Sequence, residues 1–171
     1  MPSSSIPSSG SRSAALLRGL EPRDRAPLEA LIRGTEMFYE ADVVIALELI
    51  DLGITPGGGG YSFAVAEREE RAVGYACWAL NPMSDAVHDL YWIAVERAQQ
   101  GTGLGRRLLT HVEDQVRAAK GRSLMIETGG KQSYAPTRAF YVACGYSEVA
   151  RLEDFFRIGD DKVVFAKRLD R

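Results

Sequence analysis

The sequence has few cysteines and no long apolar run. Only two cysteines occur in 171 residues, Cys77 and Cys144, and both sit among apolar neighbours. Two such thiols give no disulfide framework, so we expect reduced, buried cysteines and a cytoplasmic location. No stretch approaches the roughly 20 apolar residues that a membrane-spanning helix needs. The sequence therefore predicts no membrane partner.

Neither basic charge nor histidine is in excess. The chain has 21 Lys and Arg against 23 Asp and Glu, a formal net charge of -2. General nucleic-acid binding usually needs a basic surface, so no nucleic-acid partner is expected and an anionic ligand must be held by a local site. The two histidines, His88 and His111, have no companions at metal-ligand spacing, so no metal is expected.

What the chain does have is the composition of a globular domain. Hydrophobic residues make up 46% of the 171 residues and charged residues 26%. A chain of this size can bury a core without disulfides. Residues 1–13 are rich in Ser and Pro and lack the apolar centre of a secretory signal. We expect a disordered tail over residues 1–13 and one domain over residues 14–171.

Strand-like and helix-like periodicity alternate along the chain. Three strands with short polar turns, within residues 61–95, favour an antiparallel meander. The whole order predicts an α/β (α+β) domain with a mixed sheet, in which residues 154–161 form a loop between the last two strands. The expected strands cover 14–20, 61–66, 72–80, 87–95, 123–128, 146–151 and 162–169, and the expected helices cover 27–32, 41–52, 103–120 and 136–144.

The helix expected over residues 41–52 carries two apolar stripes. One of them can face the core. The other, formed by Ile45, Leu49 and Leu52, needs a partner of its own, which can be a subunit, a substrate or more core. On this basis we expect a homodimer.

A glycine-rich turn, Gln100-Gly-Thr-Gly-Leu-Gly105, links a strand to an amphipathic helix. Glycines let backbone N–H groups converge on a ligand, and a helix N-terminus adds a positive dipole end, so the turn suits a pyrophosphate. A P-loop would end in Gly-Lys-Ser/Thr, and a dinucleotide fingerprint would place its last glycine one residue later. Two interpretations remain: the pattern Gln/Arg-x-x-Gly-x-Gly/Ala, and a turn that merely caps a helix.

From this turn onward the sequence resembles the GCN5-related N-acetyltransferase (GNAT) superfamily. Besides the turn, the resemblance includes Ile93-Ala-Val95, Leu124-Met-Ile-Glu127 and the run from Thr137 to Tyr146. It implies a mixed sheet of about six to seven strands with about four helices. It also implies an acetyl-CoA-dependent N-acetyltransferase that acts on a primary amine by direct attack in a ternary complex. The alternative is a non-catalytic protein that senses acetyl-CoA.

The resemblance further implies where the cofactor binds. In the family, a strand splays from its neighbour and the pantetheine arm of acetyl-CoA adds to it like another strand, while backbone amides of the turn hold the pyrophosphate with help from Arg106 or Arg107. Family members often have Asn where this chain has Tyr134. The implied cofactor residues are Ile93, Ala94, Val95, Gln100, Gly101, Thr102, Gly103, Leu104, Gly105, Arg106, Tyr134 and Arg138.

Acetyl transfer to an amine requires a base for the amine and a proton donor for the departing thiolate. The resemblance places Tyr141 near the sulfur as that donor, and an aromatic anchor is the alternative role. Glu127 and Asp89 both match positions where family members carry a carboxylate base, and a carboxylate in an apolar strand tends to have a raised pKa. Either carboxylate can be the base, and each can instead be a polar rim residue or the partner of an arginine.

The acceptor is expected to be a small-molecule or peptide amine. Four carboxylates fall in segments expected at the lip of the site, and an acidic lip favours a cationic amine over a carboxylate-rich substrate. The four residues are Glu36, Glu40, Asp160 and Asp161. For Asp160 and Asp161, the alternative is a solvated acidic turn.

Overall fold

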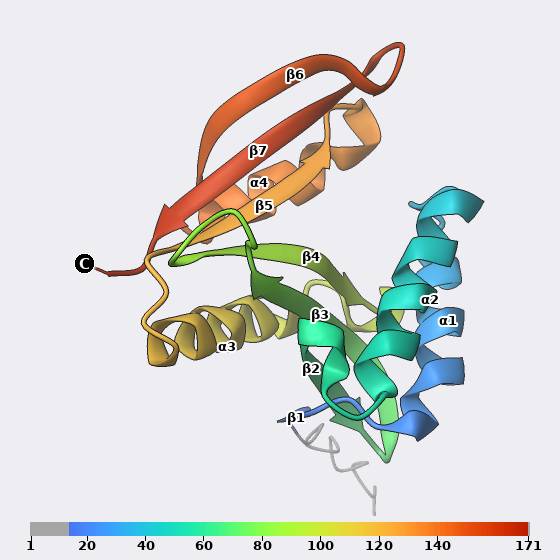
Figure 1. Ribbon diagram of the computed structural model, residues 1–171. Coiled ribbons are helices and arrows are strands. Elements are labelled where there is room, and N and C mark those ends of the chain that lie inside the picture. The colour runs from blue at the N-terminus through green and yellow to red at the C-terminus, as the bar shows by residue number, and fades with distance from the viewer. Residues whose placement is uncertain (1–13, 171) are drawn as a thin grey trace, which may run out of the picture.

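The computed structural model describes residues 14–170, and the tail expected over residues 1–13 lies outside them. Within the described residues, helices and strands follow each other in the order that the periodicity predicts (Figure 1). The strands are β1 Leu16–Arg18, β2 Ser62–Arg68, β3 Arg71–Leu80, β4 Val87–Val95, β5 Ser123–Gly129, β6 Ser147–Arg157 and β7 Asp160–Arg168, and the helices are α1 Arg25–Gly34, α2 Glu40–Ile54, α3 Leu104–Ala118 and α4 Ala135–Ala143.

The strands of residues 14–170 form one seven-stranded sheet in the order β1-β2-β3-β4-β5-β7-β6. The pair β4–β5 is parallel, and the other neighbouring pairs are antiparallel. A parallel pair needs a crossover connection, and here α3 links the end of β4 to the start of β5. The predicted meander, β2 to β4, and the predicted mixed sheet are both confirmed.

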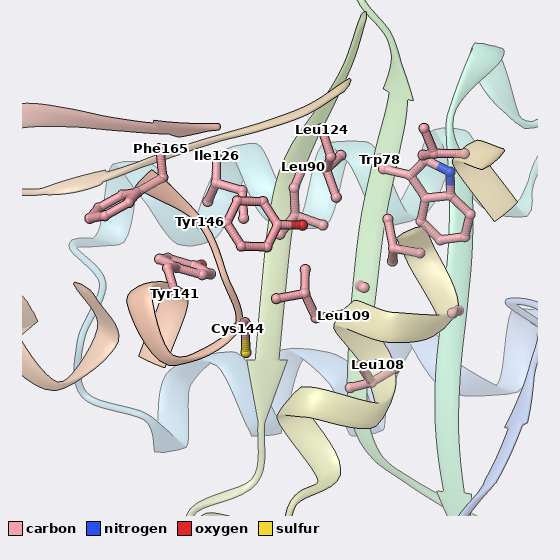
Figure 2. Packing of buried hydrophobic residues seen from close by; sticks show 14 of the residues in the cluster. Trp78, Leu90, Leu108, Leu109, Leu124, Ile126, Tyr141, Cys144, Tyr146 and Phe165 are labelled. Carbon is pink, nitrogen blue, oxygen red and sulfur yellow. The ribbon is translucent and has the colours of Figure 1, made fainter. Parts of the chain in front are cut away.

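Helices cover both faces of the sheet (Figure 1). The apolar faces of α1 and α2 bury one cluster of side chains, and those of α3 and α4 bury another on the opposite face. Figure 2 shows the second cluster, to which α3 contributes Leu108 and Leu109 and the strands contribute Leu90 and Ile126. Since helices lie on both sides of it, β3 is buried over eight consecutive residues, Ala72 to Ala79.

β4 and β5 separate part-way along their length. Their pairing runs from Val87 and Ser123 to Leu90 and Ile126, and ends there within the described residues. At this point β4 contains a bulge, because Trp78 pairs with Leu90 and Cys77 with Trp92, which leaves Tyr91 as an extra residue. A bulge bends a strand and increases its twist. The second half of β4 therefore turns away from β5.

The last two strands are longer than the sequence predicts. Residues 154–161 were expected to form a loop, but β6 and β7 extend to Arg157 and Asp160, and the turn between them is Ile158-Gly159. Gly159 has a φ of 78°, which suits a tight turn. Its N–H donates a 2.6 Å hydrogen bond to the Asp154 carboxylate. The acidic residues that indicated a loop instead close a hairpin.

Among residues 14–170, no helix combines the length and the apolarity that crossing a bilayer would require.

Candidate active site

A pocket of about 540 Å³ opens where β4 and β5 separate. Its walls are the unpaired half of β4, the end of β5, residues of α2 and α4, and the end of the β6–β7 hairpin. Residues 35–39, which join α1 to α2 and which we call the strap, form a further wall. Segments far apart in the sequence thus meet at a gap in the sheet.

Ile93, Ala94 and Val95, which the resemblance names as cofactor residues, all line this pocket. Because β4 pairs with β3 on one side only along this stretch, its peptide groups on the other side face the gap. The gap can accept an extended ligand carrying amide groups as an added strand. The pantetheine arm of acetyl-CoA has this chemistry, so these residues fit it.

The glycine turn lies between this half of β4 and α3. Gly101 and Gly103 have φ values of 74° and 85°, a conformation that favours glycine, and Gly103 is the N-cap of α3. The side chain of Thr102 donates a 2.6 Å hydrogen bond to the Gln99 carbonyl, which closes the turn. Gln100 lines the pocket and donates to the Val95 carbonyl at 3.2 Å. The first N–H groups of α3, after the buried Leu104, suit an anion.

Other predicted cofactor residues donate hydrogen bonds to backbone carbonyls of the segments around the pocket. The Arg106 guanidinium donates to the Ala143 carbonyl at 3.0 Å, at the end of α4. Arg138 donates to the Gly129 and Lys131 carbonyls at 2.8 and 2.9 Å, which fixes the loop between β5 and α4. The Tyr134 hydroxyl donates to the Met37 carbonyl at 3.0 Å and so ties that loop to the strap. Arg107 is occupied elsewhere, at the Ala15 carbonyl.

Tyr141 reaches the pocket from α4. Its side chain is 4% exposed, lines the pocket and contacts the ring of Phe140. The rings of Tyr146 and Phe165 also pack against it (Figure 2). No hydrogen bond to its hydroxyl is formed within residues 14–170, whereas the Tyr146 hydroxyl donates to Glu113. Burial raises the pKa of Tyr141, so the phenol stays protonated at neutral pH. A proton donor must be in this state.

The two candidate bases occupy the same face of the sheet, and Glu127 is the one that lines the pocket. Glu127 follows the last β4–β5 pair, and its side chain is 55% exposed and forms a 2.8 Å ion pair with Lys162. Asp89 lies one pair before that point, half-buried, and accepts a 2.7 Å hydrogen bond from Asn81. Burial, together with the nearby charge of Glu127, raises the pKa of Asp89. The structure therefore brings both carboxylates close to the gap.

Comparison with known proteins decides the family. A family model described as an acetyltransferase (GNAT) domain matches residues 59–148. The chain belongs to the GNAT acetyltransferase family. The predicted family and the predicted GNAT fold are both confirmed.

Solved structures support the same assignment. A protein from Desulfovibrio desulfuricans assigned to the GNAT family is 38% identical, with a TM-score of 0.88, and the match covers 91% of this chain and 99% of that one. An aminoglycoside 6'-N-acetyltransferase complexed with coenzyme A is 16% identical with a TM-score of 0.72, covering 91% and 98%. The protein yncA from Salmonella typhimurium, solved with acetyl-CoA, is 19% identical with a TM-score of 0.72, covering 93% and 96%. A search of curated proteins gave no match to this chain.

The expectation of an acidic lip on this GNAT pocket is wrong. Each carboxylate that suggested it has a cationic partner supplied by another part of the chain. A pattern of acidic residues along the sequence does not show which basic residues the fold brings beside them. The ion pairs are Glu36–Arg97 at 3.0 Å, Glu40–Arg33 at 2.7 Å, Asp160–Lys131 at 3.5 Å and Asp161–Arg151 at 3.1 Å.

The second apolar stripe of α2 is divided between two environments. Ile45 and Leu49 line the pocket, so part of the stripe faces the substrate side of the GNAT site. Leu52 lies outside the pocket lining and is 44% exposed. The pocket therefore explains two of the three residues of the stripe, Ile45 and Leu49.

Sequence reasoning missed several residues that shape the pocket. Phe38 of the strap meets Trp92 of β4 edge to face, with ring centroids 4.8 Å apart. Tyr39 accepts a hydrogen bond from Lys131 and lies under the guanidinium of Arg157, which is 3.7 Å from the ring centroid. The only signal was an aromatic pair, Phe38-Tyr39, in a connector between helices, and nothing local shows that this connector crosses the pocket.

Proposed function

We propose that this GNAT protein is an acetyl-CoA-dependent N-acetyltransferase that acetylates a primary amine by direct attack in a ternary complex. The observation that carries the proposal is the pocket at the gap in the sheet. Glu127 lines it directly after the last β4–β5 pair, and Tyr141 lines it from α4. A proton acceptor and a proton donor thus share one pocket, as acetyl transfer between an amine and a thioester requires.

The chain holds the cofactor chiefly with backbone groups. Acetyl-CoA supplies an acetyl group activated as a thioester. Peptide groups of Ile93, Ala94 and Val95 along the free side of β4 bind its amide-bearing arm, and N–H groups of the turn and of α3 bind its pyrophosphate. Backbone donors explain how a chain of net charge -2 binds a polyanion.

Glu127 accepts the proton of the attacking amine, and Tyr141 donates to the sulfur as the carbon–sulfur bond breaks. The nitrogen gains a bond to the acetyl carbon, so the products are an amide and a free thiol. The Lys162 ammonium lies 2.8 Å from the Glu127 carboxylate and holds it at the pocket. The second carboxylate, Asp89, lies on the same face of the sheet, one β4–β5 pair before the gap.

Two measurements test this function. Calorimetry should show binding of acetyl-CoA, and a panel of primary amines should release free thiol in the presence of the protein. Binding without thiol release from any amine would favour the alternative, a sensor of acetyl-CoA. Both cysteines of the chain are buried and free, which supports the cytoplasmic location that we also propose.

A further inference from the structure

The part of the pocket formed by the strap, β4 and β6 has an aromatic wall. Phe38 and Tyr39 of the strap, Tyr91 and Trp92 of β4, and Phe156 of β6 all line it. The bulge at Tyr91 allows two consecutive aromatic residues of β4 to serve this wall. Aromatic walls favour apolar substituents, because contact removes apolar surface from water. The pocket thus suits an acceptor with an apolar group beside its amine.

Two of the three carboxylates that line the pocket already pair with a lysine. Glu127 pairs with Lys162 at 2.8 Å, and Asp160, which is 3% exposed, has Lys131 at 3.5 Å. Asp42 accepts a 3.0 Å hydrogen bond from the backbone N–H of Tyr39 at the start of α2. With Arg157 counted, three cations face these three carboxylates, so the wall does not present an excess of negative charge to the acceptor.

Arg157, at the end of β6, differs from the two lysines in having no carboxylate partner among the described residues. It lines the pocket, and its guanidinium stacks 3.7 Å from the centroid of the Tyr39 ring. Its cross-strand neighbour is Asp160, but that carboxylate pairs with Lys131, and no carboxylate within residues 14–170 forms an ion pair with Arg157. Stacking holds the guanidinium by its face. Its N–H edge can then bind a carboxylate through two parallel hydrogen bonds.

We propose that Arg157 binds a carboxylate of the acceptor, and that the acceptor is an amino acid with an apolar or aromatic side chain. The amine points to Glu127, the side chain packs on the aromatic wall and the carboxylate meets Arg157. This inference rests on the proposed function and names its substrate class. It reverses the expectation, drawn from the acidic lip, that carboxylate-bearing substrates are disfavoured.

The test compares two amines that differ by one carboxylate, L-phenylalanine and 2-phenylethylamine. We expect the wild-type kcat/KM for phenylalanine to exceed that for phenylethylamine by at least about tenfold, because a hydrogen-bonded charge pair supplies that much discrimination. Arg157→Gln should raise the KM for phenylalanine roughly ten- to hundredfold. It should weaken the use of phenylalanine much more than the use of phenylethylamine, because only phenylalanine loses a charge pair.

Arg151→Gln is the matched control, because Arg151 lies on the same strand, pairs with Glu148 and Asp161, and is outside the pocket lining. It should leave both kcat/KM values unchanged. The inference is overturned if the wild-type protein uses the two amines equally well, or if Arg157→Gln weakens both to the same degree. In those cases amines are still acetylated, so the proposed N-acetyltransferase function stands and the amino-acid acceptor does not.

A binding experiment separates the two proposals when no amine is turned over. Calorimetry with N-acetylphenylalanine in the presence of coenzyme A needs no catalysis. Binding by the wild-type protein that Arg157→Gln weakens at least about tenfold would support the carboxylate site while the catalytic function fails. Absence of binding, or equal binding by both proteins, would overturn the inference.

Discussion

Tyr141 is surrounded by three aromatic rings, an environment typical of a packing residue, yet it also lines the pocket. Its ring stabilises α4 against the sheet, and its hydroxyl forms no hydrogen bond within the described chain. This hydroxyl is not sealed from the pocket, so water can satisfy it in the free protein. A ligand sulfur in the pocket would satisfy it, so the packing role and the donor role are compatible.

Replacing Tyr141 by Phe separates these two roles. We expect kcat to fall roughly 10² to 10⁴-fold, because the proton donor is lost, with little change in acetyl-CoA affinity or thermal stability. Steady-state kinetics and thermal unfolding measure both. Tyr146→Phe is the control: it loses a hydrogen bond to Glu113 and about 1 kcal/mol of stability, but it should keep its rate. A Tyr141→Phe protein with the wild-type rate would leave Tyr141 a packing role only, provided that chemistry limits the rate.

The two carboxylates can be distinguished by their pH profiles. A carboxylate accepts a proton only when it is ionised, so the rate should rise with pH through the pKa of the base or of the bound amine. We expect Glu127→Gln to cut the rate and flatten this rise, and Asp89→Asn to keep most of the rate. The pKa of Asp89 is raised by burial, so if Asp89 is the base, the rise lies above the ordinary carboxyl range near pH 4.

The opposite outcome, with Glu127→Gln inert and Asp89→Asn impaired, would assign the base to Asp89. Wild-type rates and pH profiles in both variants would mean that the protein relies on positioning alone. The pH dependence of kcat/KM for one amine, measured on the three proteins, decides among these outcomes.

At the scale of elements, the important junction is the one between the glycine turn and α3. Gly105 lies in the first turn of this helix, and a Cβ placed there would be 3.6 Å from the Phe140 ring and 3.9 Å from Val95, which are ordinary contacts. The position can therefore take a small side chain without strain. A negative charge near a helix N-terminus also favours the helix itself.

Gly105→Glu should therefore fold but lose acetyl-CoA. We expect its affinity to fall at least about tenfold, because the carboxylate competes with the pyrophosphate for the positive end of α3. Gly105→Ala is the matched control and should bind within a few-fold of the wild-type protein. Calorimetry gives both affinities, and circular dichroism verifies folding. A folded Glu variant with unchanged affinity would show that the turn does not hold the pyrophosphate.

At the scale of the whole molecule, the least covered element is β6. All eleven of its residues are exposed, among them Val149, Leu152 and Phe155, and it forms one edge of the sheet. An open edge of this length invites pairing with another strand. Two copies of β6 paired antiparallel about Leu152 would place Arg151 opposite Glu153. The edge strand β6 is therefore a better candidate interface for the predicted homodimer than the α2 stripe, because part of that stripe lines the pocket.

We expect light scattering at micromolar concentration to give twice the 18.7 kDa mass of the chain. Leu152→Lys should shift the protein to a monomer while preserving acetyl-CoA affinity, because a lysine disfavours edge-to-edge pairing. Leu16→Lys on β1, the opposite edge of the sheet, is the control and should leave the mass unchanged. A wild-type monomer would contradict the homodimer, and a dimeric Leu152→Lys protein would place its interface elsewhere.

The sequence by itself determined the order of the elements, the glycine turn and the family. Periodicity and turn chemistry act over a few residues, so β4, α3 and the glycine turn between them can be read from the chain directly. Ile93 to Val95 and Tyr141, which the family resemblance names, line the pocket in the structure. The roles of Glu127, Asp89 and the other site residues stay predictions until the variants above are measured.

Only the tertiary structure decided which side chains share the pocket and which charges remain unmatched. The bulge at Tyr91 turns β4 away from β5, which alternation along the strand cannot foretell. The ion pair of Glu36 with Arg97 joins residues 61 positions apart, and the stack of Arg157 on Tyr39 joins two separate elements. Such contacts depend on where the fold brings distant segments together. The sequence therefore predicted an acidic lip where the structure has matched charges and one stacked arginine.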